Sequence, residues 1–331
     1  MPFELKAADI LLYRSDSVVS RAIRFVDDTE VSHAGLYLGD GTVGEALTNG
    51  GLQRQPFQRS ITGSQWVAVR RLANTPPEMQ PVLDKAENYL NHGERYAFGQ
   101  IFLLAGICLL RRANLSNPLV RRMAQAVIDK AAAFVRRCQS DGTQPMICSE
   151  FVYRAYHEAV QGADNPYNIE VTEFWSAASR PLILGWRGRE PSVAIPPESL
   201  LGTIQAQHGS LDAALESATA RATVAPVVSD EELETIIEAC LSDPAGTNPK
   251  AMLEAGPEVG MDELRRSIAN FAVALYETSA SSPATGERPL LTVAAPSATP
   301  ADALAEFSAD FVTPGDLFRS PSLATVGKVR P

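Results

Sequence analysis

The chain has 331 residues, which at roughly 150 residues per domain predicts about two domains. Hydrophobic residues make up 45% and charged residues 21% of the chain, a composition typical of globular proteins with a buried core. The formal net charge of −10 is uneven: residues 1–160 contain 18 basic and 16 acidic residues, whereas residues 161–331 contain 11 and 23. An acidic chain without a dominant basic face argues against a nucleic-acid binder, and we expect no nucleic-acid partner.

The first 72 residues have the pattern of strands and turns around one helix. Short apolar or alternating runs predict strands at 10–13, 35–39, 42–47 and 66–72, and Asp40-Gly41 is typical of a hairpin turn. Apolar residues spaced along 18–26 predict a helix capped by Ser15 or Asp16.

The rest of the chain is predicted to be mainly helical. A helix is expected from Pro76-Pro77 to about His92, further helices within 96–137, and one over 147–160. Two acidic helices are expected at 229–241, capped by Ser229, and at 261–279. Segments 189–199 and 287–303 are rich in Pro, Ala, Ser and Thr and predict linkers or irregular loops.

The four cysteines, Cys108, Cys138, Cys148 and Cys240, form no Cys-x-x-Cys pair, so neither a disulfide scaffold nor a closed zinc site is expected. No apolar region follows a basic N-terminus, and the most apolar run, 101–110, is shorter than the ~20 residues that span a bilayer. We therefore expect a cytoplasmic protein. Export by a route that uses no N-terminal signal is left open.

Two residues have the chemistry of a nucleophile and its base. Cys148 lies at the predicted N-terminus of an amphipathic helix, where free backbone N–H groups and the helix dipole stabilise a thiolate. The same N–H groups suit the oxyanion of a tetrahedral intermediate. His33 begins a predicted strand, a rigid place from which an imidazole can meet that thiol. Taken singly, each also fits a structural role, Cys148 as a small buried residue and His33 as a core or surface histidine.

Glu45 is the candidate residue that orients His33. It can do so only if both side chains lie on the same face of the sheet. A two-residue turn at Asp40-Gly41 would pair Glu45 with Leu36, on the face opposite to His33. A three-residue loop over 39–41, with Gly41 in the left-handed conformation, pairs Glu45 with Gly35 and puts the carboxylate on the face of His33. A His33–Glu45 pair therefore predicts the longer loop.

Taken together, SHAGLYLGDGTVGEAL (32–47) and ICSEFVYRAY (147–156) resemble the permuted branch of the NlpC-type papain-like superfamily, which includes YiiX/YebB-like proteins and lecithin:retinol acyltransferase-like enzymes. His33 precedes Cys148, the permuted order, and Glu45 occupies the position of the family's third polar residue. The segment FVTPGDLFRSPSLATVG (311–327) resembles a stretch that normally follows the cysteine helix. The resemblance covers roughly residues 5–160 and 311–328.

The resemblance implies an α+β fold in three parts. These are a circularly permuted papain-like core with an antiparallel sheet and helices at 1–160, an acidic, mainly helical insertion at 161–310, and a segment at 311–331 that returns to the core. It implies acyl transfer through a Cys148-His33-Glu45 triad and an acyl-thioester, with no metal or organic cofactor. Cys138, Cys148 and His157 are disfavoured as metal ligands because no two of them form a tight pair.

Relatives with this fold act on peptide or cell-wall amides or on lipid acyl chains. The apolar segment 97–110 precedes seven basic residues within 111–140, where Asp129 is the one acid, a combination that suits an anionic membrane surface. The alternative is a buried core helix followed by a solvated basic helix, for which docking on the acidic domain is left open. We favour a lipid acyl ester as substrate, with an amidase or peptidase acting on peptide or cell-wall fragments as second hypothesis and a non-catalytic binding module as third. The oligomeric state is left open.

Overall fold

The computed structural model describes residues 3–48, 50–93, 96–97, 99–111, 114–160, 165–171, 195–219, 227–281, 299–309 and 311–331. The chain forms two compact units, which are described separately. The first comprises 1–98, 146–190 and 312–331, and the second comprises 99–145 and 191–311. The sequence predicted residues 99–145 as part of the core at 1–160, whereas in the structure they belong to the second unit together with the acidic helices. That the second unit is an insertion into a papain-like core stays a prediction.

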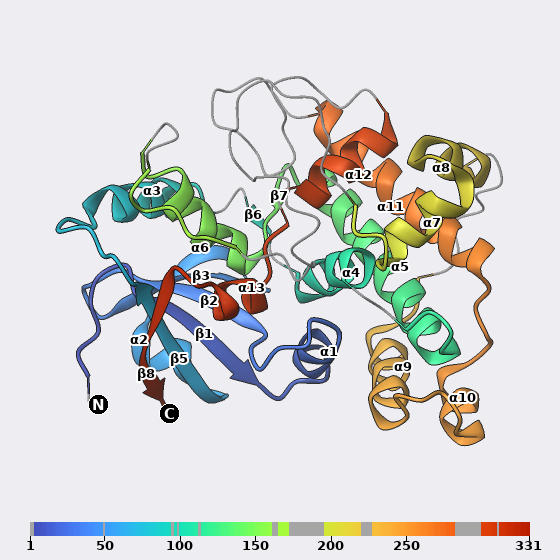
Figure 1. Ribbon diagram of the computed structural model, residues 1–331, viewed down its shortest axis with the longest axis horizontal. Helices are drawn as coiled ribbons and strands as arrows, with labels where there is room; N and C mark the ends of the chain where they lie inside the picture. Colours follow the sequence, from blue (N-terminus) through green and yellow to red (C-terminus); the bar gives the residue numbers. More distant parts are fainter. Residues whose placement is uncertain are drawn as a thin grey trace. The chain divides into compact units, whose positions relative to one another are not determined.

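The first unit is built on a six-stranded antiparallel sheet with the order β4-β3-β2-β1-β5-β8 (Figure 1). Its strands are β1 (Ile10–Ser15), β2 (His33–Tyr37), β3 (Thr42–Leu47), β4 (Gly51–Pro56), β5 (Ser64–Leu72) and β8 (Leu323–Val329). Its helices are α1 (Val18–Val26), α2 (Phe57–Ile61), α3 (Gln80–Asn91), α6 (Cys148–His157) and α13 (Pro314–Arg319), and a short strand, β6, covers Tyr96–Ala97. This sheet with its helices confirms the expected α+β class.

Both faces of the sheet are covered. One face packs against α2 through a core that includes Leu11, Val43, Phe57 and Val69. On the other face α6 lies over β2 and β3, and α3 packs against α6 and β4. Gly44 of β3 lies close beneath Phe151 of α6, since a Cβ there would come within 3.0 Å of its ring. Alternation along each strand explains these two apolar faces.

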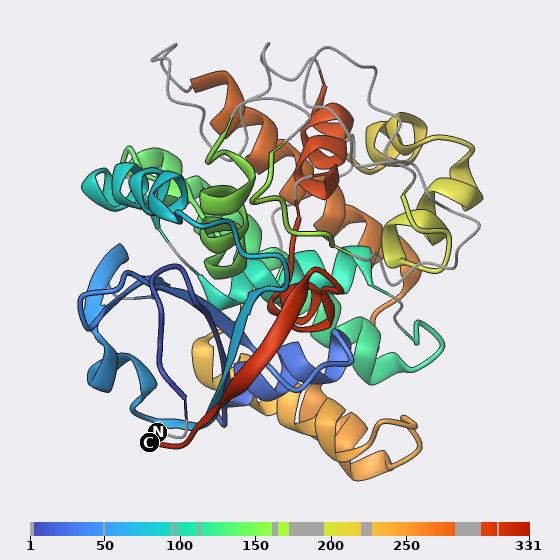
Figure 2. The same cartoon turned by 60° about the vertical axis from the view of Figure 1, so that its left-hand side comes forward.

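The returning C-terminal segment supplies the outer strand β8, which pairs with β5 (Figure 2). Figure 2 shows the two chain ends side by side, and Phe3 packs against Gly327, where a Cβ would come within 2.2 Å of the Phe3 ring. The late segment singled out by its motif therefore completes the sheet of the first unit.

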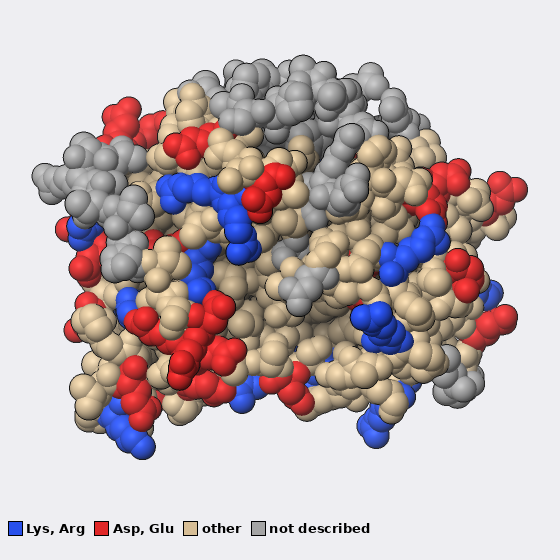
Figure 3. All heavy atoms as spheres, turned by 180° about the vertical axis from the view of Figure 1, so that it is seen from behind, with Lys and Arg blue, Asp and Glu red and all other residues tan. Residues whose placement is uncertain are grey.

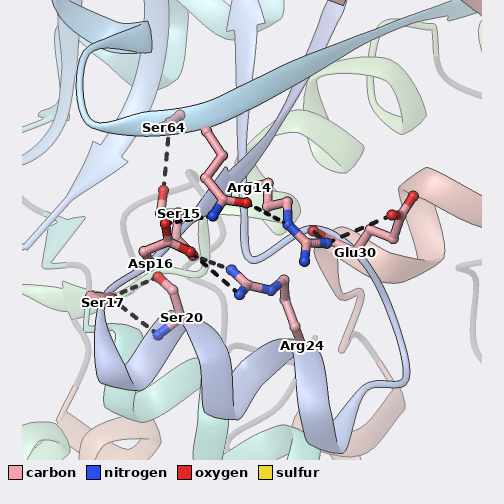
Figure 4. Close-up of polar contacts among 9 residues, drawn as sticks. Arg14, Ser15, Asp16, Ser17, Ser20, Arg24, Glu30 and Ser64 are labelled. Atoms are coloured by element: carbon pink, nitrogen blue, oxygen red, sulfur yellow. Dashed lines mark hydrogen bonds and ion pairs between the residues drawn. The ribbon is translucent and has the colours of Figure 1, made fainter. Parts of the chain in front are cut away.

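The predicted elements differ from the structure in several details. The cap of α1 is Ser17, whose hydroxyl accepts from the backbone N–H of Ser20 at 3.2 Å, because Ser15 still belongs to β1 (Figure 4). Arg24 of this helix lies against the Ser15 carbonyl and 3.8 Å from the Asp16 carboxylate (Figure 4). Helix α3 starts at Gln80 rather than at Pro76-Pro77, and β4 and α2 carried no predicted pattern.

The second unit is helical in its described part, apart from the short strand β7 (Gln144–Pro145). Its helices are α4 (Gln100–Leu110), α5 (Pro118–Ser140), α7 (Leu200–His208), α8 (Leu211–Thr219), α9 (Asp230–Ser242), α10 (Pro249–Ala255), α11 (Met261–Ser281) and α12 (Pro300–Ala309). Ser229 caps α9 as predicted, with its hydroxyl accepting from Glu232 N–H at 3.0 Å. Pro300 begins a helix where a linker was expected, and the expected linkers at 189–194 and 287–298 lie outside the described residues.

Aromatic packing forms part of the core of the second unit. Phe102 of α4 lies with its ring centroid 6.0 Å from that of Phe271 of α11 and 5.3 Å from that of Phe307 of α12. Rings at these separations add stabilisation beyond the burial of their surface. The segment 101–110 is thus a core helix, and within the described residues no helix is long and apolar enough to cross a membrane.

Candidate active site

A hairpin of β2 and β3 brings His33 and Glu45 together. The backbone N–H of Leu38 donates to the Thr42 carbonyl at 3.0 Å, which closes a three-residue loop of Gly39, Asp40 and Gly41. Gly35 then pairs with Glu45, the register that a His33–Glu45 pair requires. His33 Nε2 lies 3.0 Å from Glu45 Oε2, and both side chains are buried.

The loop conformation depends on its two glycines. Gly39 has φ +96° and Gly41 has φ +83°, values that other residues adopt only with strain. Asp40 between them accepts a hydrogen bond from Thr42 N–H at 3.1 Å. The loop therefore has the left-handed glycine at position 41 that the sequence predicts, and this conformation sets the face on which Glu45 lies.

Cys148 is the first residue of α6, as the sequence predicts. Ile147 before it is extended, with φ −92° and ψ 142°, and no side chain caps the first turn. The Cys148 side chain is fully buried. The first-turn N–H groups of a helix have no partner within the helix, so they are suited to stabilise negative charge on the thiol or on a bound oxyanion.

The rest of α6 is fixed by buried charge pairs. Arg154 Nε lies 2.8 Å from Glu150 Oε1 one turn earlier, and both side chains are buried. Arg154 also lies 3.7 Å from Glu158, whose other carboxylate oxygen is 2.7 Å from Lys85 of α3. Removing one partner of such a pair leaves an uncompensated buried charge, so this network holds the helix and its first residue in one orientation.

Cys148 acts on the charge of His33, and Glu45 is hydrogen-bonded to Nε2 of the same ring. Burial opposes the charged imidazolium, but the negative charges of Cys148 and Glu45 outweigh it and raise the pKa of His33 from 6.5 to about 10. The arrangement therefore favours a protonated His33. All three candidate residues are brought together.

Sequence reasoning missed Tyr13 of β1. It is the cross-strand partner of His33, and the two ring centroids are 5.1 Å apart. Burial, followed by the nearby Glu45 carboxylate, raises the pKa of the phenol well above 10, which keeps it neutral. Aligning 10–13 against 33–36 as an antiparallel pair would have revealed this neighbour, but no short turn connects those strands.

The C-terminal segment also reaches the first turn of α6. Ser149, next to Cys148, donates its hydroxyl proton to the Val312 carbonyl at 2.6 Å, and both residues are buried. Thr313 caps α13 through a reciprocal pair of bonds with Asp316. Arg70 of β5 donates to the carbonyls of Phe318 at 2.6 Å and Ser320 at 2.8 Å. Within the first unit, the residue next to Cys148 is thus hydrogen-bonded to a segment more than 160 positions later.

The segment expected to face a membrane is engaged within the second unit. Nine of the eleven residues of α4 are buried. Along α5, Lys130 lies 2.7 Å from Asp230, Arg121 lies 2.5 Å from Glu258, and Arg122 lies 3.4 Å from Glu232. Acidic and basic side chains are interspersed on the face shown in Figure 3. These contacts match the alternative in which a basic helix docks on the acidic region.

Comparisons with known proteins extend the sequence resemblance. No family model matches the chain. Over 157 residues it is 26% identical to the probable lipoprotein peptidase YaeF of Escherichia coli strain K12, a match that covers 47% of this chain and 57% of that protein. The chain thus spans little more than half the length of this relative. The match is in line with the family resemblance that the motifs indicate.

A solved structure is also similar to the chain. The crystal structure of the metalloprotein yiiX from Escherichia coli O157:H7 is 19% identical, covers 48% of this chain and 68% of that one, and superposes with a TM-score of 0.31. Among the described residues of the present chain, no group of three or more His, Cys, Asp or Glu side chains is arranged to hold a metal ion.

Proposed function

Proceeding from this YiiX-like papain-like relationship, we propose that the chain is a cysteine-dependent acyl hydrolase with a Cys148-His33-Glu45 triad. The observation that carries the proposal is the position of His33, which bonds to Glu45 through Nε2 and interacts with Cys148 on the same ring. Nucleophile, base and orienting group in contact form the arrangement that covalent acyl transfer requires.

The reaction follows from the roles of these atoms. Nε2 of His33 is engaged by Glu45, so Nδ1 is the nitrogen that exchanges a proton with the Cys148 thiol. The thiolate attacks the substrate carbonyl carbon and forms a C–S bond, and N–H groups at the start of α6 stabilise the oxyanion. The imidazolium then gives its proton to the leaving group as the C–S-linked acyl-enzyme forms. Water, deprotonated by His33, releases the acid and restores the thiol.

We propose an amide as the substrate class. The relative YaeF has the name of a probable lipoprotein peptidase, which supports hydrolysis of peptide bonds or of other amides. The hypothesis of a lipid ester substrate depended on residues 97–137 facing a membrane. Within the described residues, α4 is buried, and cations of α5 form ion pairs with acids of the same unit. A lipid acyl ester is the alternative substrate.

Parallel incubations test this proposal. The purified chain is mixed with muropeptides in one series and with phospholipid vesicles in the other, and released peptides or amines and fatty acids are measured by mass spectrometry. We expect amide cleavage that is lost in Cys148→Ala and retained in Cys138→Ala, a matched cysteine on α5. Release of fatty acid with intact muropeptides would establish the ester alternative. Absence of both, together with an unreactive Cys148 thiol, would favour the binding module.

A further inference from the structure

Tyr13 covers the imidazole of the candidate base. It is the direct cross-strand partner of His33, and its ring plane is tilted 51° to the imidazole with centroids 5.1 Å apart. The side chain is 1% exposed and belongs to the core shared by β1, β3, β5 and α2. A large side chain in this position displaces water from one side of the imidazole.

The Tyr13 hydroxyl is fixed at its far end. It lies 2.6 Å from the Ser60 hydroxyl on α2. It also lies above Gly35, where a Cβ would come within 3.0 Å of the phenol oxygen and within 2.9 Å of Val43. Gly35 is the cross-strand partner of Glu45. The Tyr13 phenol therefore extends from the His33 imidazole to the backbone next to Glu45. The absence of a side chain at Gly35 is what leaves room for it.

We propose that Tyr13 is a positioning residue for the His33–Glu45 pair, excluding water from the Nε2–Oε2 hydrogen bond and holding the imidazole toward Cys148. The inference rests on the proposed function, since it assigns a role within the same site. Among the described residues, the ionisable side chains of Tyr13 from β1, Glu45 from β3 and Cys148 from α6 lie around the imidazole. The raised pKa of the Tyr13 phenol keeps it neutral, so its ring excludes water without adding charge.

The physical consequence concerns the strength of the charge pairing. Coulomb attraction between His33 and its anionic partners is several times stronger in a dry site than in water. Water in the space of the Tyr13 ring would weaken both the burial penalty and the attraction, so the pKa of His33 would move back toward 6.5. The solvent exchange of its Nε2–H proton would accelerate for the same reason.

Histidine NMR tests this role without a substrate, because the chain has only four histidines: His33, His92, His157 and His208. Labelled histidine rings are titrated in the full chain, with His33→Gln identifying the His33 signals. We expect Tyr13→Leu to lower the pKa of His33 by about one pH unit or more and to accelerate Nε2–H exchange about tenfold. Tyr13→Phe, which keeps the ring and removes the bond to Ser60, should stay close to the wild type in both measurements.

Two outcomes separate this inference from the proposed function. If Cys148→Ala leaves the pKa of His33 unchanged in otherwise wild-type protein, the nucleophile–base pair itself is wrong. If Cys148→Ala lowers that pKa but folded Tyr13→Leu leaves both the pKa and the exchange rate unchanged, only the role of Tyr13 is overturned. Should Tyr13→Leu fail to fold, Tyr13→Met serves in its place because it also removes the aromatic ring from the imidazole. A folded Tyr13→Met with wild-type values would equally overturn the inference.

Discussion

Glu45 is the cross-strand partner of Gly35, and this one register places its carboxylate 3.0 Å from Nε2 of His33. A shift of the hairpin by a single residue would turn Glu45 to the other face of the sheet, away from the imidazole. The loop of Gly39, Asp40 and Gly41 therefore sets the geometry of the site through the register of β2 and β3.

Replacing Glu45 by Gln tests the orienting role. The amide fills the same space but removes the charge that favours the imidazolium, and it can present its NH2 group to Nε2. We expect the rate of amide cleavage to fall roughly 10²- to 10⁴-fold while the protein stays folded. The matched control is Glu30→Gln, an exposed acid paired with Arg14, which should keep the wild-type rate. Equal rates for both variants would remove Glu45 from the mechanism.

The alkaline limb of the pH–rate profile reports on His33. Its pKa is raised from 6.5 to about 10, so the imidazolium that protonates the leaving group persists through neutral pH and is lost as the pH rises through 10. The same raised pKa makes the protonated side chain stabilising below about pH 6.5 and progressively less so up to pH 10. A steady-state profile from pH 6 to 11 should decline only at its alkaline end, and a decline centred near 6.5 would contradict the pairing.

Arg70 is expected to hold the C-terminal segment on the first unit. Its buried guanidinium donates to the carbonyls of Phe318 and Ser320, and Arg70→Met would leave these oxygens without that donor. We expect a loss of about 2–4 kcal/mol in the free energy of unfolding, measured by urea denaturation. Arg59→Met, at an exposed position of α2, should change the free energy by less than about 0.5 kcal/mol. A neutral Arg70→Met would show that β8 holds the segment alone.

Ser149, the residue next to the proposed nucleophile Cys148, is hydrogen-bonded to the returning C-terminal segment. Ser149→Ala removes the 2.6 Å bond to the Val312 carbonyl and should cost about 1–2 kcal/mol of unfolding free energy. Because the bond orients the first turn of α6, we also expect a lower rate of amide cleavage with little change in KM. Ser64→Ala, at a part-buried hydroxyl with a 3.5 Å contact, is the control. If Ser149→Ala loses stability but keeps the full rate, the bond holds the fold without orienting Cys148.

The ion pairs formed by the cations of α5 predict how the protein binds to lipid vesicles. Lys130, Arg121 and Arg122 neutralise acids of α9 and of the segment that follows α10, so they offer little net charge to a lipid surface. Cosedimentation with phosphatidylserine-rich vesicles should then match that with phosphatidylcholine vesicles at low salt. Strong, salt-sensitive binding to the anionic vesicles alone would restore the membrane-facing interpretation of 97–137.

The features that could be predicted from the sequence are local ones. Cys148 at a helix start follows from the amphipathic pattern after it, and the face of Glu45 follows from counting residues around the Asp40-Gly41 loop. Both depend on spacings of a dozen residues or fewer, for which backbone geometry leaves few options.

The features that could not be predicted depend on pairing across long stretches of chain. Tyr13 becomes a neighbour of His33 only because β1 lies between β2 and β5 in the sheet. The cations of α5 appeared unpartnered because Asp230 and Glu258 lie about 100 residues or more further along the chain. Neither pairing leaves a local pattern, so the charge count over 111–140 left both a membrane surface and a docked basic helix open.

The central claim, that Cys148 forms an acyl-thioester with the help of His33, is tested most directly by mass spectrometry of the protein itself. The chain is incubated with p-nitrophenyl acetate, quenched in acid and digested, and each cysteine peptide is examined for acetylation. We expect a hydroxylamine-sensitive acetyl group on Cys148 that forms far more slowly in His33→Ala, with Cys108, Cys138 and Cys240 unmodified. An unmodified Cys148, or equal acetylation of Cys148 in the wild type and in His33→Ala, would contradict the account.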